Sequence, residues 1–154
     1  MGEIRIHKRS SAPVETVWAV LYDQLGMAAW VPLSSVRLER EGEPPPNGVG
    51  AIRVLSGLGL RVREEITAVE PPTRLTYRLL SGAPVRDYIG ETALTAVDGA
   101  TDIVWTAALR SRVPGVTLVV RLIISAMAKG LVAESERRER ETDSSSATGT
   151  TLEA

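Results

Sequence analysis

The longest apolar stretch of the chain follows Pro114 and predicts one long helix near the C-terminal end of the sequence. At helical spacing its few polar residues, Thr117, Arg121, Ser125 and Lys129, fall four apart and form one narrow stripe. Aliphatic residues and methionine occupy the rest of the circumference, so we expect a buried helix that is covered on more than one side. Arg121 and Lys129 argue against a membrane span, since each would cost roughly 2.5–3.5 kcal/mol near the bilayer centre.

Alternation of apolar and polar residues predicts a first strand at residues 3–9 and six more strands after two helical segments. A helix is expected from Pro13 to about Leu25, and a second helical turn is expected just before Pro32. The later strands are expected at residues 34–40, 48–56, 60–70, 73–82, 86–97 and 101–112. Seven strands joined mainly by short turns indicate an antiparallel meander and an α+β fold.

Two charged residues are expected on the sheet face that meets the long helix. A tight hairpin at residues 56–59 places Leu55 opposite Val62 and Arg53 opposite Glu64. Buried charges are tolerated only when they pair or bind something, so we expect an ion pair inside the protein. The pair either cross-braces two strands or contacts a ligand, and the sequence does not choose between these roles.

Further polar and aromatic side chains fall on the same face. The turn at residues 98–100 is expected to place Leu94 opposite Trp105 and Thr92 opposite Ala107. Each such residue taken alone is better explained as ordinary core, but an apolar cavity with a few convergent polar groups is typical of small-ligand sites. The residues expected to contact a ligand are Trp30, Arg53, Glu64, Tyr77, Tyr88, Thr92, Trp105, Ile123 and Met127.

Composition narrows the classes of function. The 154 residues fit one domain, expected over residues 1–141, and the low-complexity end at 142–154 predicts a disordered tail. A net charge of −1 gives no overall positive field to attract nucleic acid, so no nucleic-acid partner is expected. With no cysteine and with His7 as the single histidine, facing solvent, the sequence predicts no metal centre and no cofactor. No secretory signal opens the sequence, so we expect a cytoplasmic protein.

Several segments form a familiar pattern in this order: APVETVWAVLYD, W-V-P, GVGAIRVL, VREEITAVEPPTRLTYRLL, VRDYIGETALT, GATDIVWTAAL and a closing helix. From Glu3 to Ala133 the chain resembles the START-like, or SRPBCC, superfamily, in particular its polyketide cyclase/dehydrase branch. The resemblance implies a helix-grip fold, in which a curved seven-stranded antiparallel sheet wraps around the C-terminal helix and leaves a deep cavity for a hydrophobic ligand. The residues that match family positions are Ala12, Pro13, Trp18, Arg53, Glu64 and Tyr77.

Three hypotheses about function follow. The first is a binding protein for a small hydrophobic or aromatic molecule, lipid-like or polyketide-like, with Arg53 meeting a ligand oxygen. The second is a polyketide cyclase or dehydratase, in which Arg53 polarises a carbonyl and Glu64 or Tyr88 moves a proton. Because a close cation depresses the pKa of a carboxyl, pairing with Arg53 would weaken Glu64 as a base. The third is a co-chaperone-like interaction domain, with a homodimer sharing the long helix.

Overall fold

The computed structural model describes residues 2–149 of the chain. Its strands are β1 (Gly2–Ser10), β2 (Ser35–Arg40), β3 (Ile52–Gly57), β4 (Leu60–Glu70), β5 (Arg74–Ser81), β6 (Arg86–Val97) and β7 (Ala100–Arg110). Its helices are α1 (Val14–Tyr22), the short 3-10 helix η1 (Leu25–Ala29) and α2 (Val116–Gly149). The seven strands form one antiparallel sheet in the order β1-β7-β6-β5-β4-β3-β2, which confirms the predicted α+β architecture.

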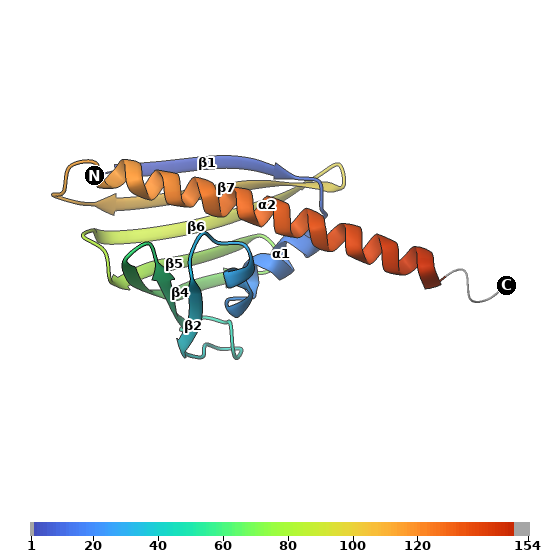
Figure 1. The fold of residues 1–154 in the computed structure, drawn as a ribbon, viewed down its shortest axis with the longest axis horizontal. Coiled ribbons are helices and arrows are strands. Elements are labelled where there is room, and N and C mark those ends of the chain that lie inside the picture. Colours follow the sequence, from blue (N-terminus) through green and yellow to red (C-terminus); the bar gives the residue numbers. More distant parts are fainter. Residues whose placement is uncertain (1, 150–154) are drawn as a thin grey trace.

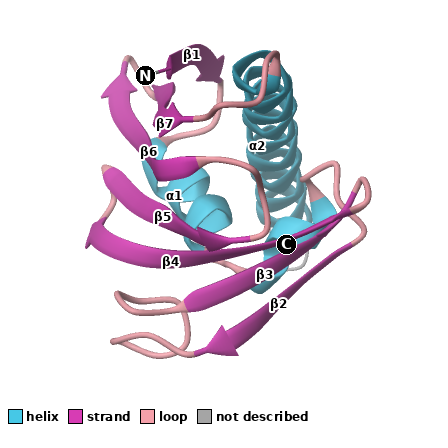
Figure 2. Ribbon diagram, turned by 90° about the vertical axis from the view of Figure 1, so that its left-hand side faces the viewer, coloured by secondary structure: helices cyan, strands magenta, loops and turns pink. Residues whose placement is uncertain are grey.

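The sheet curves around the long C-terminal helix. Figure 2 shows the strands bending around one side of α2, with α1 and η1 on the same concave side. Successive strands from β2 to β7 pair as hairpins, while β1 closes the far edge by pairing with β7. In Figure 1 the second half of α2 continues past the sheet. This arrangement is the expected helix-grip fold.

The predicted pairing of β3 with β4 is confirmed, because Arg53 lies opposite Glu64 and Leu55 opposite Val62. The residues at the intervening turn include Leu58, whose φ of 56° is in the left-handed region. The hairpin therefore fixes the register on which the position of the ion pair depends.

The predicted register of β6 against β7 is wrong by two residues. Thr92 pairs with Trp105, not with Ala107. The turn holds only Asp98 and Gly99, whose φ values of 52° and 80° fit the two-residue hairpin turns that favour Asp-Gly. Because the shift is an even number of residues, the same side chains still face the helix.

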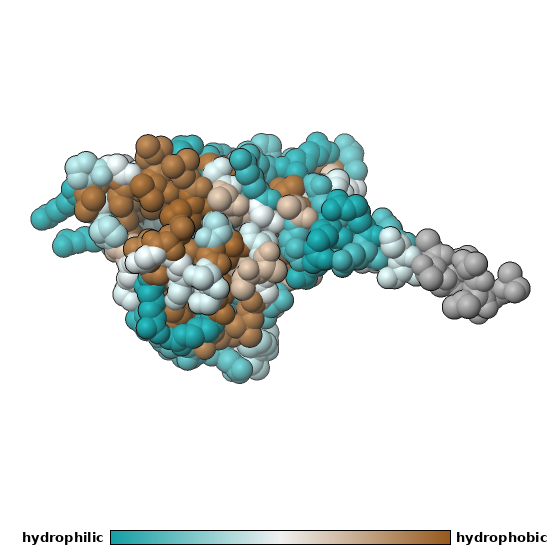
Figure 3. Space-filling model, viewed as in Figure 1, coloured by the Kyte–Doolittle hydropathy of each residue, from teal (hydrophilic) through white to brown (hydrophobic). Residues whose placement is uncertain are grey.

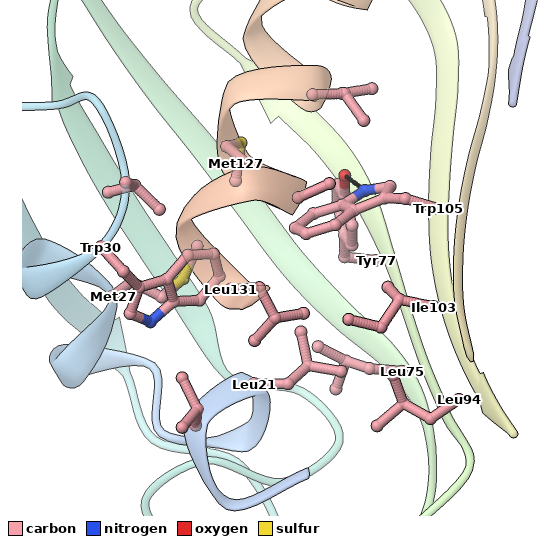
Figure 4. Packing of buried hydrophobic residues seen from close by; sticks show 14 of the residues in the cluster. Leu21, Met27, Trp30, Leu75, Tyr77, Leu94, Ile103, Trp105, Met127 and Leu131 are labelled. Carbon is pink, nitrogen blue, oxygen red and sulfur yellow. Dashed lines mark hydrogen bonds between the residues drawn. The ribbon is translucent and has the colours of Figure 1, made fainter. Parts of the chain in front are cut away.

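The hydrophobic core lies between the sheet and the two helices. Figure 4 shows side chains from α1, η1, the sheet and α2 meeting there, with Leu131 of α2 near Leu21 and Leu75. All three of these side chains are almost fully buried. Trp18, expected in the core, is partly buried and stacks on Tyr22 with ring centroids 5.5 Å apart.

Helix α2 is covered on one face only, which corrects the expectation of burial on more than one side. Ile124 and Ala128 are buried, whereas Leu118 is 60% exposed and Leu122 is 62% exposed. By length and composition the segment Val116–Ser146 could also cross a membrane, the only such segment among the described residues. Because its buried face packs on β1, β7 and α1, we assign α2 as the core helix of this fold.

Two element ends differ from the prediction. Helix α1 stops at Tyr22, because Asp23 leaves the helical conformation and its side chain accepts a hydrogen bond from the backbone of Gly26 at 3.1 Å. Leu25 consequently lies on η1 and is 52% exposed. Helix α2 runs to Gly149, through much of the expected tail at 142–154, while residues 150–154 lie outside the described part of the chain.

Candidate functional site

An ion pair lies inside the concave side of the sheet, where β3 and β4 run together. The Nε atom of Arg53 donates to Oε1 of Glu64 at 3.0 Å, and a terminal guanidinium nitrogen lies 3.0 Å from the same oxygen. Both side chains are buried, with Arg53 only 1% exposed. The hairpin register of β3 and β4 brings them together, as the sequence predicts.

Helical residues complete the environment of the Arg53 guanidinium. Its Nη1 atom donates to Oε1 of Gln24 at 2.6 Å and lies 3.1 Å from the sulfur of Met27. The guanidinium carbon lies 4.7 Å from the centre of the Tyr77 ring, a cation–π geometry. The guanidinium is therefore held by the protein on several sides.

The pKa of Glu64 is raised above its usual value, since burial outweighs the opposing attraction of Arg53. Arg53 lowers the pKa of Glu64, as expected, but the net direction is the opposite of the expectation because burial has the larger effect. A carboxyl with a raised pKa is a stronger proton acceptor than an exposed one once it is ionised.

Two tyrosines and a tryptophan form a hydrogen-bonded chain beside the ion pair. Nε1 of Trp105 donates to the hydroxyl of Tyr77 at 3.0 Å, and that hydroxyl lies 3.4 Å from the hydroxyl of Tyr88. Burial raises the pKa of Tyr77 to about 12 and raises that of Tyr88 well above its usual value. Both phenols are therefore neutral hydrogen-bonding groups at physiological pH.

Gly90 provides the room for the Tyr77 ring. The two residues are directly paired across β5 and β6. A Cβ atom at position 90 would lie 2.2 Å from the Cζ atom of Tyr77, which no real contact tolerates. The absence of a side chain at Gly90 thus sets the position of the phenol.

An apolar cavity of about 140 Å³ lies between α2 and the sheet, next to these polar groups. Its polar lining comes from Glu64, Tyr77 and Tyr88, and the remaining walls are aliphatic apart from Met127. The full lining consists of Leu33, Leu55, Gly57, Leu58, Leu60, Val62, Glu64, Tyr77, Leu79, Ala83, Pro84, Val85, Tyr88, Val116, Val119, Val120, Ile123, Ile124 and Met127. The exposed members Leu58, Leu60 and Val119 mark its mouth, between the β3–β4 hairpin and the first turns of α2.

The structure places the predicted ligand-contacting residues in two groups. Those that line the cavity are Glu64, Tyr77, Tyr88, Ile123 and Met127. Those that are buried but do not line it are Trp30, Arg53, Thr92 and Trp105. Arg53 and Trp105 do not contact the cavity, but each donates a hydrogen bond to a residue that lines it. Arg53 donates to Glu64, and Trp105 donates to Tyr77.

Trp30 and Thr92 lie deeper in the core. Neither the indole nitrogen of Trp30 nor the hydroxyl of Thr92 has a hydrogen-bond partner in the described structure. A buried polar group without a partner costs about 1–3 kcal/mol. Their role in ligand binding stays a prediction.

The sequence analysis did not identify one loop that lines the cavity. The β5–β6 loop, with Ala83, Pro84 and Val85, reads in the sequence as a connection only, yet all three residues line the cavity. No local pattern signals this, because the loop becomes part of the cavity wall only where it meets the β3–β4 hairpin and the start of α2. Gln24 was missed because a helix and a strand must be placed in space before their side chains can be paired.

No group of three or more metal-ligating side chains occurs in the described residues. His7 is exposed on β1, with its Nε2 atom 3.6 Å from a carboxylate oxygen of Asp102. The chemical groups of the cavity are therefore a carboxyl and two phenols.

Comparison with protein families gives one match, which covers residues 1–138. The matching family is described as polyketide cyclase / dehydrase and lipid transport. A comparison with curated proteins finds no match.

Solved structures share the fold. A protein of Nitrosospira multiformis is 21% identical and superposes with a TM-score of 0.76, covering 90% of this chain and 99% of that one. The Zhui aromatase/cyclase from Streptomyces sp. R1128 is 22% identical, with a TM-score of 0.70 over 89% of this chain and 94% of that one. The Aha1 dimer of Colwellia psychrerythraea is 14% identical, with a TM-score of 0.73 over 88% and 97%.

Proposed function

Because the chain belongs to the polyketide cyclase/dehydrase and lipid transport family, we propose that it binds a small hydrophobic or aromatic molecule in the cavity beneath α2. The observation that carries the proposal is the lining of this cavity, aliphatic over most of its wall with Glu64, Tyr77 and Tyr88 as its polar side chains. Small-ligand sites have this composition, because apolar walls supply affinity while a few polar groups fix orientation.

The volume limits the ligand. An apolar cavity of about 150 Å³ holds a benzene-sized molecule, and the cavity here measures about 140 Å³. One monocyclic aromatic ring or a short acyl segment therefore fits inside. A longer lipid or polyketide-like molecule would leave its remainder at the mouth, against Leu58, Leu60 and Val119.

The tyrosine chain sets the polarity of the bound group. The hydroxyl of Tyr77 accepts a hydrogen bond from Trp105, and in its contact with Tyr88 either hydroxyl can be the donor. With Tyr77 as the donor, the Tyr88 proton is free for a ligand oxygen. This arrangement favours a carbonyl or hydroxyl group on the ligand, at the end of the cavity beside Glu64.

A fluorescent apolar compound that brightens on binding tests the proposal. We expect the protein to bind it and small phenols or aryl ketones to displace it. Val120→Trp should abolish binding by filling the cavity, whereas Leu122→Trp introduces the same side chain at an exposed site on the same helix and should leave binding unchanged. Equal binding by both variants would contradict the proposal. Native mass spectrometry of the purified protein then identifies any small molecule that it retains.

A second candidate function is catalysis of a cyclisation or dehydration, favoured by a carboxyl of raised pKa facing the same cavity as a neutral phenol. In loss of water from a β-hydroxy ketone, Glu64 would take the proton from the carbon next to the carbonyl. The carbon–oxygen bond would break as Tyr88 protonates the departing hydroxyl. Arg53 does not line the cavity, so its part would be to hold Glu64 in place.

Substitution separates the two functions. If the protein is a dehydratase, Glu64→Gln should reduce turnover of a β-hydroxy ketone by roughly 10²-fold or more. Binding of the fluorescent apolar compound should persist in this variant. Turnover that is unchanged in this variant would discard catalysis by Glu64. A protein-interaction role and a homodimer stay predictions, which sedimentation at several concentrations tests.

A further inference from the structure

An exposed apolar surface surrounds the mouth of the cavity. It consists of Leu58, Leu60, Leu118, Val119 and Leu122, which are between 41% and 67% exposed, and we call it the apolar rim. Figure 3 shows a continuous hydrophobic area over the first half of α2 and the neighbouring surface. Contiguous exposed apolar surface of this kind marks a contact site. The sheet does not cover it, because the sheet packs on the opposite face of α2.

A groove rich in arginine adjoins the apolar rim at the same end of the molecule. It is lined by Arg86, Arg110 and Arg112, which we call the arginine groove. The cavity and this groove share the β5–β6 loop residues 83–85 in their linings. Figure 1 shows the loops β5–β6 and β7–α2 at the same end as the start of α2.

The arginine groove carries a local positive charge that the whole chain does not have. Its only acidic lining residue among those described is Asp87, which lies 3.8 Å from Arg110. Three guanidinium groups against one carboxylate leave a surplus of two positive charges, while the chain as a whole carries −1. Arg110 and Asp87 are both more than half exposed, so their pairing neutralises little of this field.

We propose that this end of the molecule binds the surface of an anionic lipid bilayer. The apolar rim would enter the boundary between headgroups and acyl chains, and the arginine groove would lie against lipid phosphates. Interfacial binding increases with buried apolar area and with attraction between basic residues and anionic lipids, and both contributions are present here on adjoining surfaces.

The charges favour a bilayer over a second copy of the chain. A copy docked on this end through a two-fold axis would bring two arginine grooves close together, which costs energy. The rim also surrounds the cavity mouth, so an apolar molecule could pass between bilayer and cavity without crossing water.

Sedimentation of the full chain with vesicles tests the inference. We expect binding to phosphatidylglycerol vesicles that is weakened by salt and is roughly tenfold or more stronger than binding to phosphatidylcholine vesicles. Two double variants should each lower binding by at least roughly tenfold: Leu118→Ser with Leu122→Ser, and Arg86→Glu with Arg112→Glu. Neither double variant changes a residue that lines the interior of the cavity, so the test is independent of the proposed ligand binding.

Matched controls make the same chemical changes elsewhere. Leu25→Ser with Ile89→Ser removes two exposed apolar side chains, and Arg9→Glu with Arg140→Glu reverses two exposed charges away from the arginine groove. Both controls should bind vesicles as the parent protein does. Equal binding to the two vesicle types, absence of binding, or equal losses in the controls would overturn the proposal. So would a dimer that Leu118→Ser with Leu122→Ser dissociates, because the rim would then be a protein interface.

Discussion

At the residue scale, the buried pair of Arg53 and Glu64 supports a prediction about stability. Arg53→Met leaves the Glu64 carboxyl buried without its partner, so we expect a loss of about 3–5 kcal/mol in the free energy of unfolding. The double variant Arg53→Met with Glu64→Leu removes both charges and should be more stable than Arg53→Met alone. Urea denaturation measures both, and a double variant less stable than the single one would contradict the ion-pair account.

The raised pKa of Glu64 predicts a pH dependence of stability. The folded protein holds this proton more tightly than the unfolded chain, so the contribution of Glu64 to stability falls as pH rises from about 4.5 through the folded pKa. The stability difference between the parent protein and Glu64→Gln should therefore shrink as pH rises.

Glu39 provides a control, because its pKa is shifted in the opposite direction to that of Glu64. Its hydrogen bond to Arg63 lowers its pKa, so its contribution is present above 4.5 and is lost as pH falls through the folded pKa. Urea titrations of Glu39→Gln and Glu64→Gln across this range should show opposite slopes relative to the parent. If the two stability differences changed with pH in the same direction, burial would not be the larger influence on the pKa of Glu64.

Gly90 gives a prediction about the position of the Tyr77 ring. Gly90→Ala places a methyl group 2.2 Å from a ring carbon, so the ring must move and its hydrogen bond with Trp105 should weaken. We expect a shift of the indole N–H resonance of Trp105 in the NMR spectrum and a stability loss of about 1–3 kcal/mol. Gly99→Ala is the control for a stability loss alone: its φ of 80° makes alanine strained there, but a Cβ at Gly99 meets no atom within 4 Å, so the Trp105 resonance should not move. An unmoved Trp105 resonance in Gly90→Ala would contradict this account.

The sequence could predict the ion pair but not its surroundings, for a physical reason. The pairing of Arg53 with Glu64 depends on one hairpin, and a hairpin register follows from local turn length. The contact of Arg53 with Gln24 joins residues far apart in the chain through the packing of a helical segment on a strand. The sign of the Glu64 pKa shift likewise depends on depth of burial, which register alone does not give.

At the element scale, α2 supports a prediction that separates its two faces. Leu131→Ala removes a fully buried side chain and should cost about 2–5 kcal/mol in the free energy of unfolding. Leu122→Ala removes the same side chain at 62% exposure on the same helix and should cost less than about 1 kcal/mol. Thermal or urea unfolding compares them. Similar large losses at both positions would mean that a partner covers the exposed face in solution.

The exposed face of α2 could not be read from its sequence. A helix that is apolar around most of its circumference fits burial on all sides, but one sheet curves around only part of a helix. Leu118 and Leu122 are left outside because no further element of the described chain packs on that side. The register of β7 was mispredicted for a simpler reason, since the expected pairing of Leu94 with Trp105 leaves four residues, 98–101, between the paired strands, whereas the turn holds only Asp98 and Gly99.

At the scale of the whole molecule, the fold was predictable and the cavity only in part. Alternating strands and one long apolar helix specify a sheet wrapped around a helix, and the sequence resemblance names the same fold. The cavity walls depend on where the β3–β4 hairpin, the β5–β6 loop and the start of α2 meet. Those elements are distant in sequence, so the contributions of Pro84 and Val85 were not predictable from local patterns.

We propose that the cavity beneath α2 binds a small apolar molecule whose oxygen faces Tyr88 and Glu64. The most direct measurement is a crystal structure of the protein soaked with a monocyclic phenol. We predict electron density for the ring inside the cavity, between Ile123 and Tyr77, with the phenol oxygen within hydrogen-bonding distance of Tyr88 or Glu64. A cavity filled by the protein's own side chains, or a phenol bound only outside it, would contradict the account.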